Sequence, residues 1–180
     1  MDRETLLDAL RRWADCIDNH GGEVIEFSMD NPLPLSKFKA ANAHFEGELT
    51  PLEAFYCNLA SRVRFVWDWG DYCGSFCWSF HQVDWILPEE YYWTNELPST
   101  ERDLRLLTVE EFANGDQLVL FCKGENRGKI GFFYHDDALS NLNPFVFGDV
   151  EYLLTTWSRI AFASLECYDD FTDTVTGRFS

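Results

Sequence analysis

Four histidines are the side chains best suited to act as a base or to bind a metal near neutral pH. They are His20, His44, His81 and His135. None lies in a motif such as His-Glu-x-x-His. His135 precedes Asp136 and Asp137, and this run could supply a general base or a ligand. A polar strand end that enters a loop explains the same three residues, and we prefer that interpretation.

The six cysteines are also candidates for metal binding or disulfide formation. Cys73 and Cys77 are four residues apart, wider than a Cys-x-x-Cys pair, and no second pair follows at zinc spacing. The others are scattered among apolar neighbours, which favours buried thiols in a reducing cytoplasm. We therefore expect no metal site and a cytoplasmic protein.

Gly115-Asp116 could form a turn that contacts phosphate, but no glycine-rich loop with a lysine follows it. A turn between strands is the simpler interpretation, because glycine permits positive φ and aspartate bonds neighbouring backbone. Paired carboxylates could also act as acid and base, yet spacing cannot select two of 31 acidic residues. We predict no catalytic residues, no cofactor and no enzymatic activity. An enzyme whose site escapes motif analysis is the alternative.

The charge balance is the strongest signal in the composition. Asp and Glu total 31 against 14 Lys and Arg, which gives a formal net charge of −17. Such a charge repels phosphate backbones, so direct nucleic-acid binding is not expected, and it favours a basic partner. The alternative is that acidity only keeps the protein soluble.

One segment, from Phe65 to Glu101, contains no Lys or Arg and most of the tryptophans. Aromatic side chains give contact area with few rotatable bonds, and carboxylates steer a basic partner. The segment therefore predicts a protein-binding surface. The candidate partner-binding residues are Asp68, Trp69, Asp71, Tyr72, Asp84, Glu89, Glu90, Tyr91, Tyr92 and Trp93.

Core packing is the competing explanation for the aromatic residues of this segment. Val63, Phe65 and Trp67 alternate along one face of an expected strand, which predicts that Trp67 is buried. Phe76, Trp78 and Phe80 share a face in the same way. Whether the segment as a whole forms interface or core stays open at this point.

Periodicity predicts the elements that would position these residues. Apolar residues at helical spacing indicate a helix over residues 4–20, and a short strand over 24–27 follows. Thr50-Pro51-Leu52-Glu53 has the pattern of a capping box and predicts a second helix. Strands over 62–67 and 75–80 would be joined by a hairpin-like turn over 68–74.

The remaining chain is expected to form mostly antiparallel sheet and a final helix. Strands are predicted over residues 104–109, 117–122 and 129–134, with a helix from Asp149 whose apolar face extends to Leu165. The fold class is α+β, a mostly antiparallel sheet flanked by N-terminal, middle and C-terminal helices. We expect an accessory helical segment, 1–48, packed on a main domain, 49–180. No segment has the length or apolarity of a membrane span, and no signal peptide is expected.

Three segments resemble the SUKH superfamily, which includes fungal cell-wall assembly regulators and bacterial immunity proteins. The first, residues 111–120, runs Glu-Phe-Ala-Asn-Gly-Asp-Gln-Leu-Val-Leu and is similar to the superfamily's central signature. Residues 128–137 are similar to its second strand, which ends near a histidine or aspartate. Residues 146–154 are similar to its final helix start. The resemblance covers about residues 49–167.

The resemblance implies a divergent SUKH-like domain and a non-enzymatic, protein-binding function. It favours an immunity protein that neutralises a basic, nuclease-type toxin by covering its active surface with carboxylates. The alternative within the same superfamily is a regulatory or scaffold protein of the cell-wall assembly regulator type, with no toxin partner.

Overall fold

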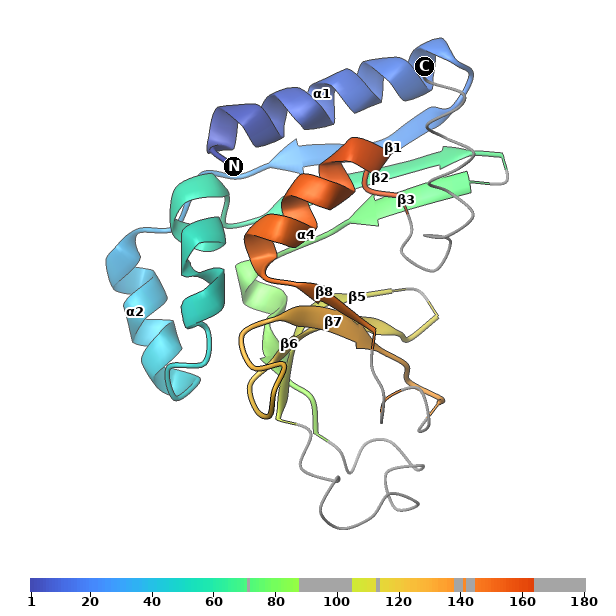
Figure 1. Ribbon diagram of the computed structural model, residues 1–180. Helices are drawn as coiled ribbons and strands as arrows, with labels where there is room; N and C mark the ends of the chain where they lie inside the picture. The colour runs from blue at the N-terminus through green and yellow to red at the C-terminus, as the bar shows by residue number, and fades with distance from the viewer. Residues whose placement is uncertain (71, 88–104, 113, 138–140, 142–144, 164–180) are drawn as a thin grey trace.

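The computed structural model describes residues 1–70, 72–87, 105–112, 114–137, 141 and 145–163. Helices pack against two antiparallel sheets, so the predicted α+β class is confirmed. The first sheet has the strand order β1-β2-β3 and the second β4-β5-β6-β7-β8. Figure 1 shows the first sheet beneath helix α1 and the second sheet below it.

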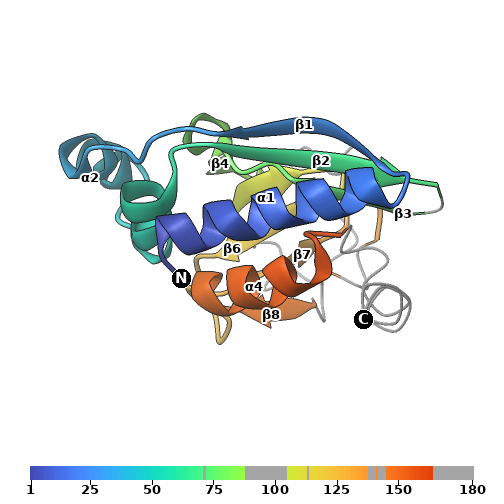
Figure 2. The same cartoon turned by 90° about the horizontal axis from the view of Figure 1, so that it is seen from above.

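Helix α1, Arg3–Asn19, confirms the predicted N-terminal helix. Asp2 caps it by accepting a hydrogen bond from the Thr5 amide at 2.8 Å. Its buried stripe packs into the core through Leu6, Ala9, Leu10 and Ile17. The indole N–H of Trp13 donates to the carbonyl of Ser158 at 2.7 Å, which holds α1 beside the end of helix α4, Val150–Trp157. Figure 2 shows the two helices side by side.

The first sheet consists of β1, Glu23–Met29, β2, Val63–Trp69, and β3, Tyr72–Phe76. The predicted hairpin is present, but Trp69 pairs with Tyr72, so both strands extend into the stretch predicted as a turn. Strand β3 also ends earlier than predicted, at Phe76. Because β1 pairs with β2, the N-terminal 48 residues share a sheet with later strands. The proposed boundary at residue 48 stays a prediction.

The stretch between β1 and β2 contains one helix that was not predicted, and the predicted second helix as 3-10 and π turns. Helix α2, Leu35–His44, buries only Phe38, so it lacks a clear apolar stripe. The predicted capping box at Thr50 is wrong. Thr50 lies inside the 3-10 helix Thr50–Leu52, and its hydroxyl donates to the Gly47 carbonyl. Asn42 instead bonds the Leu49 amide at 2.9 Å, and a π-helix, Phe55–Leu59, follows.

The second sheet contains the three predicted strands as β5, Leu106–Glu111, β6, Gln117–Phe121, and β7, Ile130–Phe133. Two short edge strands were not predicted, β4, Asp84–Trp85, and β8, Val146–Gly148. Asp149 caps α4 as expected, accepting from the Tyr152 amide at 2.8 Å. Helix α4 ends at Trp157, earlier than the apolar face suggested, and the 3-10 helix Ser158–Ile160 follows.

The core settles part of the ambiguity about the tryptophans. Trp67, Trp78 and Trp157 are among the largest fully buried side chains. The Trp67 indole donates to the Ala161 carbonyl at 2.7 Å, and the Phe76 ring stacks on Phe162 at a centroid distance of 4.7 Å. These tryptophans are therefore core residues. Among the described residues, no helix is long and apolar enough to cross a membrane.

Candidate protein-binding site

The ten predicted partner-binding residues do not form one surface in the described part of the chain. Asp71, Glu89, Glu90, Tyr91, Tyr92 and Trp93 lie outside the described residues. Asp68, Trp69 and Tyr72 lie together at the turn end of the β2–β3 hairpin. Asp84 lies on β4, in the second sheet, near α2 and away from that end (Figure 2).

The end of helix α1 meets the hairpin and adds residues that the sequence did not single out. The His20 ring contacts the Trp69 ring edge to face at a centroid distance of 6.4 Å. At Gly22 an added Cβ would lie 3.1 Å from the Asp68 carbonyl oxygen, so the α1–β1 turn passes close to β2. We call this surface the acidic end. It comprises Asp18, His20, Glu23, Asp68, Trp69 and Tyr72.

Three exposed carboxylates of the acidic end are placed unfavourably for folding. Glu23 lies directly opposite Asp68 in the β1–β2 register, where like charges destabilise a strand pair. Asp18 lies in the last turn of α1, where no basic residue is present and the helix dipole is negative. None of the three forms an ion pair within the described residues. The acidic end therefore holds negative charge that no described residue neutralises.

Many of the described arginines, in contrast, are already paired with carboxylates elsewhere. Arg105 bonds Glu46 at 2.8 Å and Arg127 bonds Glu48 at 3.0 Å. Arg64 bonds Glu26 at 2.7 Å. Each pair also uses one carboxylate, so the excess of acidic over basic side chains, 31 against 14, stays unpaired.

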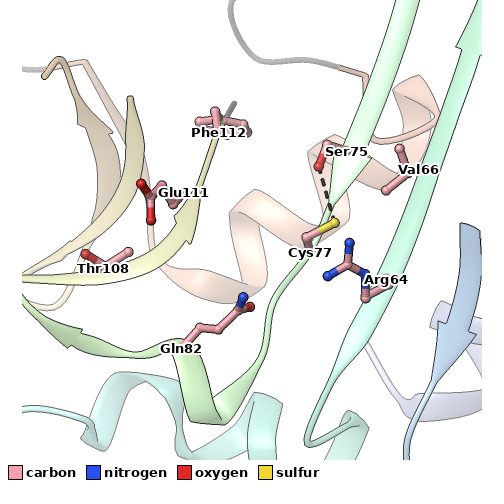
Figure 3. A pocket seen from close by; sticks show the side chains of 8 residues that line it. All are labelled: Arg64, Val66, Ser75, Cys77, Gln82, Thr108, Glu111 and Phe112. Carbon is pink, nitrogen blue, oxygen red and sulfur yellow. Dashed lines mark hydrogen bonds between the residues drawn. The ribbon is translucent and has the colours of Figure 1, made fainter. Parts of the chain in front are cut away.

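A groove crosses the face of the first sheet opposite α1. By strand alternation, Phe65 and Trp67 of β2 point into the core, whereas Arg64, Val66 and Asp68 face the groove. One hollow has a volume of about 600 Å³. Figure 3 shows its lining side chains, most of which come from β2 and β3 on one side and β5 on the other. Its lining side chains are Arg64, Val66, Ser75, Cys77, Gln82, Thr108, Glu111 and Phe112.

A second hollow, of about 390 Å³, continues the first toward the acidic end. The two share Val66, Ser75, Glu111 and Phe112, and the second is also lined by Asp68. We call the two together the strand groove. The groove thus starts at a residue of the acidic end and runs toward the helical turn Phe80–Gln82, next to β4.

A buried carboxyl group, Glu110 of β5, lies behind the strand groove and is 2% exposed. Its Oε1 accepts hydrogen bonds from the Ser75 hydroxyl at 2.9 Å and from the Cys77 amide at 3.0 Å. Its Oε2 has no hydrogen bond of normal geometry to a described residue. Burial raises the pKa of Glu110 to about 8, although these hydrogen bonds and the nearby Trp78 and Arg64 favour the ionised form.

The Cys77 thiol and the Tyr56 hydroxyl, which lie near Glu110, are both protonated at neutral pH and are therefore poor nucleophiles. Burial, followed by the charge of Glu110, raises the pKa of the Cys77 thiol, so the thiol stays protonated at neutral pH. Burial also raises the pKa of the Tyr56 hydroxyl, which lies fully buried near the same carboxyl. The cluster therefore behaves as a buried acid behind the strand groove.

Asp116 and His135, which the sequence analysis considered separately, are in contact in the structure. Asp116 Oδ1 lies 3.0 Å from both the His135 amide and its Nδ1. The hydrogen bond to Asp116 raises the pKa of His135, and an oxygen of Asp136 lies near the same atoms. Asp116 Oδ2 also accepts a hydrogen bond from the side-chain Nδ2 of Asn114 at 2.8 Å. The cluster joins the turn before β6 to the end of β7, as a polar strand end would.

Comparison with known proteins gives no relative from which a function could be transferred. No family model, no curated protein and no solved structure matches the chain. The resemblance to the SUKH superfamily therefore stays a prediction that rests on three short segments.

Proposed function

We propose that this protein is an acidic binding module whose partner is a basic protein, and that it engages this partner through the acidic end. The observation that carries the proposal is the placement of Asp18, Glu23 and Asp68. All three are exposed, lack ion pairs among the described residues and lie where their charge opposes folding. Charges that destabilise the free protein gain a favourable role when a cationic surface covers them.

The aromatic residues of the acidic end suit the same role. Trp69 and Tyr72 are half-buried, so each is held by the core and still presents part of its ring to solvent. By strand alternation the Trp69 and Tyr72 rings lie on the core face of the sheet at the hairpin end, and Asp68 lies on the groove face. A partner that covers this end of the hairpin would meet both aromatic contact area and steering charge.

The resemblance to immunity proteins supports a more specific proposal. The partner is then a basic, nuclease-type toxin, and the carboxylates cover the surface with which it binds phosphate. The net charge of −17 agrees with such a target, because an enzyme that acts on nucleic acid presents a cationic surface.

The test is co-expression with the products of neighbouring open reading frames. We expect a basic protein from this neighbourhood to co-purify with the chain and, if it is toxic, to lose its toxicity. The double substitution Glu23→Gln, Asp68→Asn should weaken both effects. Glu125→Gln, which removes an exposed carboxylate from the turn between β6 and β7, should not.

The proposed interface, the immunity role and the existence of a basic partner are each rejected by a different result. Undiminished rescue by a folded Glu23→Gln, Asp68→Asn variant rejects the acidic end as the interface. A co-purifying basic protein without toxicity rejects the immunity role and favours a regulatory or scaffold role. The absence of any basic partner rejects the proposed function itself.

A further inference from the structure

The strand groove, with hollows of about 600 and 390 Å³, has the volume to admit a long side chain of a partner. Its two hollows share four lining residues and therefore form one continuous depression along β2 and β3. Figure 3 shows the first of them, between these strands and β5. Its walls combine apolar surface, at Val66 and Phe112, with hydroxyl and amide groups at Ser75, Thr108 and Gln82. Such mixed walls suit the stem and the polar head of a long side chain.

The charges of the groove favour a cationic occupant. The lining carboxylates Asp68 and Glu111 are both exposed. Arg64 is the lining guanidinium, and it is engaged by Glu26. A third carboxyl, Glu110, lies behind Ser75, whose hydroxyl donates to its Oε1. Its Oε2 lies near the Trp78 indole and has no hydrogen bond of normal geometry to a described residue. A cation that enters the groove would lie near the exposed carboxylates of Asp68 and Glu111 and, beyond Ser75, near the buried carboxyl group of Glu110.

We propose that a lysine or arginine side chain of the basic partner enters the strand groove, contacts Ser75 and displaces the proton from Glu110. This inference rests on the proposed function for the nature of the partner. No bond other than that to the proton breaks. The proton passes to solvent, and the cation replaces it as the counter-charge of the carboxylate.

The surroundings of Glu110 explain why a cation would have this effect. The titratable and charged groups that face it are Arg64 from β2, Cys77 from the segment after β3 and Tyr56 from the π-helix. Arg64 is paired with Glu26, and Cys77 and Tyr56 stay neutral, so no described residue serves as a dedicated counter-ion of Glu110. Its raised pKa agrees with a carboxyl that keeps its proton in the free protein. A positive charge about 4–6 Å away lowers a carboxyl pKa by about 1–3 units.

The test uses hexa-arginine as the probe, because arginine does not titrate in the relevant range. Calorimetric titrations at pH 7.5, in two buffers of different ionisation enthalpy, measure the protons released on binding. If the pKa of Glu110 falls from about 8 by about two units, about 0.7 proton is released and the affinity rises about 20-fold from pH 6.5 to 8.5.

Three variants separate this effect from general attraction to an acidic protein. Glu110→Gln should bind the peptide with little proton release and a nearly flat pH profile. Glu111→Gln removes a neighbouring surface charge and should weaken binding while keeping the release. Glu125→Gln, remote from the groove, should behave like the wild type. Should Glu110→Gln fail to fold, the carboxyl ¹³C shift of Glu110 in the wild type can be titrated with and without peptide.

The possible results decide the inference independently of the proposed function. Proton release that persists in Glu110→Gln, or an unshifted ¹³C titration of Glu110 in the complex, overturns it. Failure of hexa-arginine to bind overturns it as well. In each of these cases, capture of a basic partner through the acidic end would still uphold the proposed function.

Discussion

At the residue scale, the ionisation of Glu110 depends strongly on its surroundings. In an unfolded chain it would ionise near the ordinary glutamate pKa of 4.5, whereas burial raises its pKa to about 8 in the folded protein. The folded state therefore binds more protons than the unfolded state between these two values. Stability linked to Glu110 is fully present below about pH 4.5 and is lost as the pH rises toward 8.

We predict that Glu110→Gln removes this part of the pH dependence. Glutamine resembles the protonated acid in size and charge, and its carbonyl can still accept from Ser75 and the Cys77 amide. Urea titrations at pH 5.5, 7.0 and 8.5 should show wild-type stability falling by on the order of 1 kcal/mol per pH unit. The variant should change much less. Because His135 also loses stabilising charge as the pH rises, a small slope should remain in both proteins. Parallel profiles would contradict the prediction.

At the element scale, the pairing of β1 with β2 places Glu23 opposite Asp68. We predict that either Glu23→Gln or Asp68→Asn stabilises the free protein by about 0.2–1 kcal/mol, because each removes a like-charge contact. The double substitution should add little to either single change, since the repulsion is already gone. Urea unfolding of the four proteins gives the coupling energy. A destabilising effect of both single changes would contradict this account of the acidic end.

The outer edge of β3 depends on a glycine for its close contact with the chain after α4. An added Cβ at Gly74 would lie 2.1 Å from the Trp67 indole nitrogen and 2.7 Å from the Phe162 carbonyl. We predict that Gly74→Ala destabilises the protein by about 2 kcal/mol or more, because neither the core indole nor the backbone can move freely. Cys73→Ala, at the exposed neighbouring position, should change stability by less than about 0.5 kcal/mol. Equal effects of the two would show that the edge is loosely packed.

The same elements show how far the sequence could predict the structure. Helix α1 and strands β6 and β7 were predicted because their apolar period is regular. Helix α2 was missed because it buries only Phe38. The cap at Thr50 failed because Asn42, eight residues away, bonds the turn instead. Glu110 could not be singled out among 31 acids, since its burial follows from β3 and β5 meeting across the two sheets.

At the scale of the whole molecule, the net charge of −17 acts on both folding and association. Like charges held in a compact shape repel one another more than in an extended chain, so the charge opposes folding. The described ion pairs are mostly exposed, and exposed pairs contribute little to stability. Salt screens both the repulsion between like charges and the attraction within ion pairs. Because the repulsion is the larger of the two, we expect salt to stabilise the folded protein.

We predict that raising NaCl from about 0.02 to about 0.5 M increases the thermal midpoint by several degrees, because a change of about 1 kcal/mol shifts the midpoint of a domain this size by a few degrees. The Glu23→Gln, Asp68→Asn variant, with two fewer charges, should start higher and gain less. The same salt should slow association with a basic partner, since steering by charge is screened. Thermal melts and stopped-flow association, measured on the same samples, test the two effects together. A midpoint that falls with salt would mean that attractive pairs outweigh the repulsion, and the acidic surface would then be a stabilising feature of the fold.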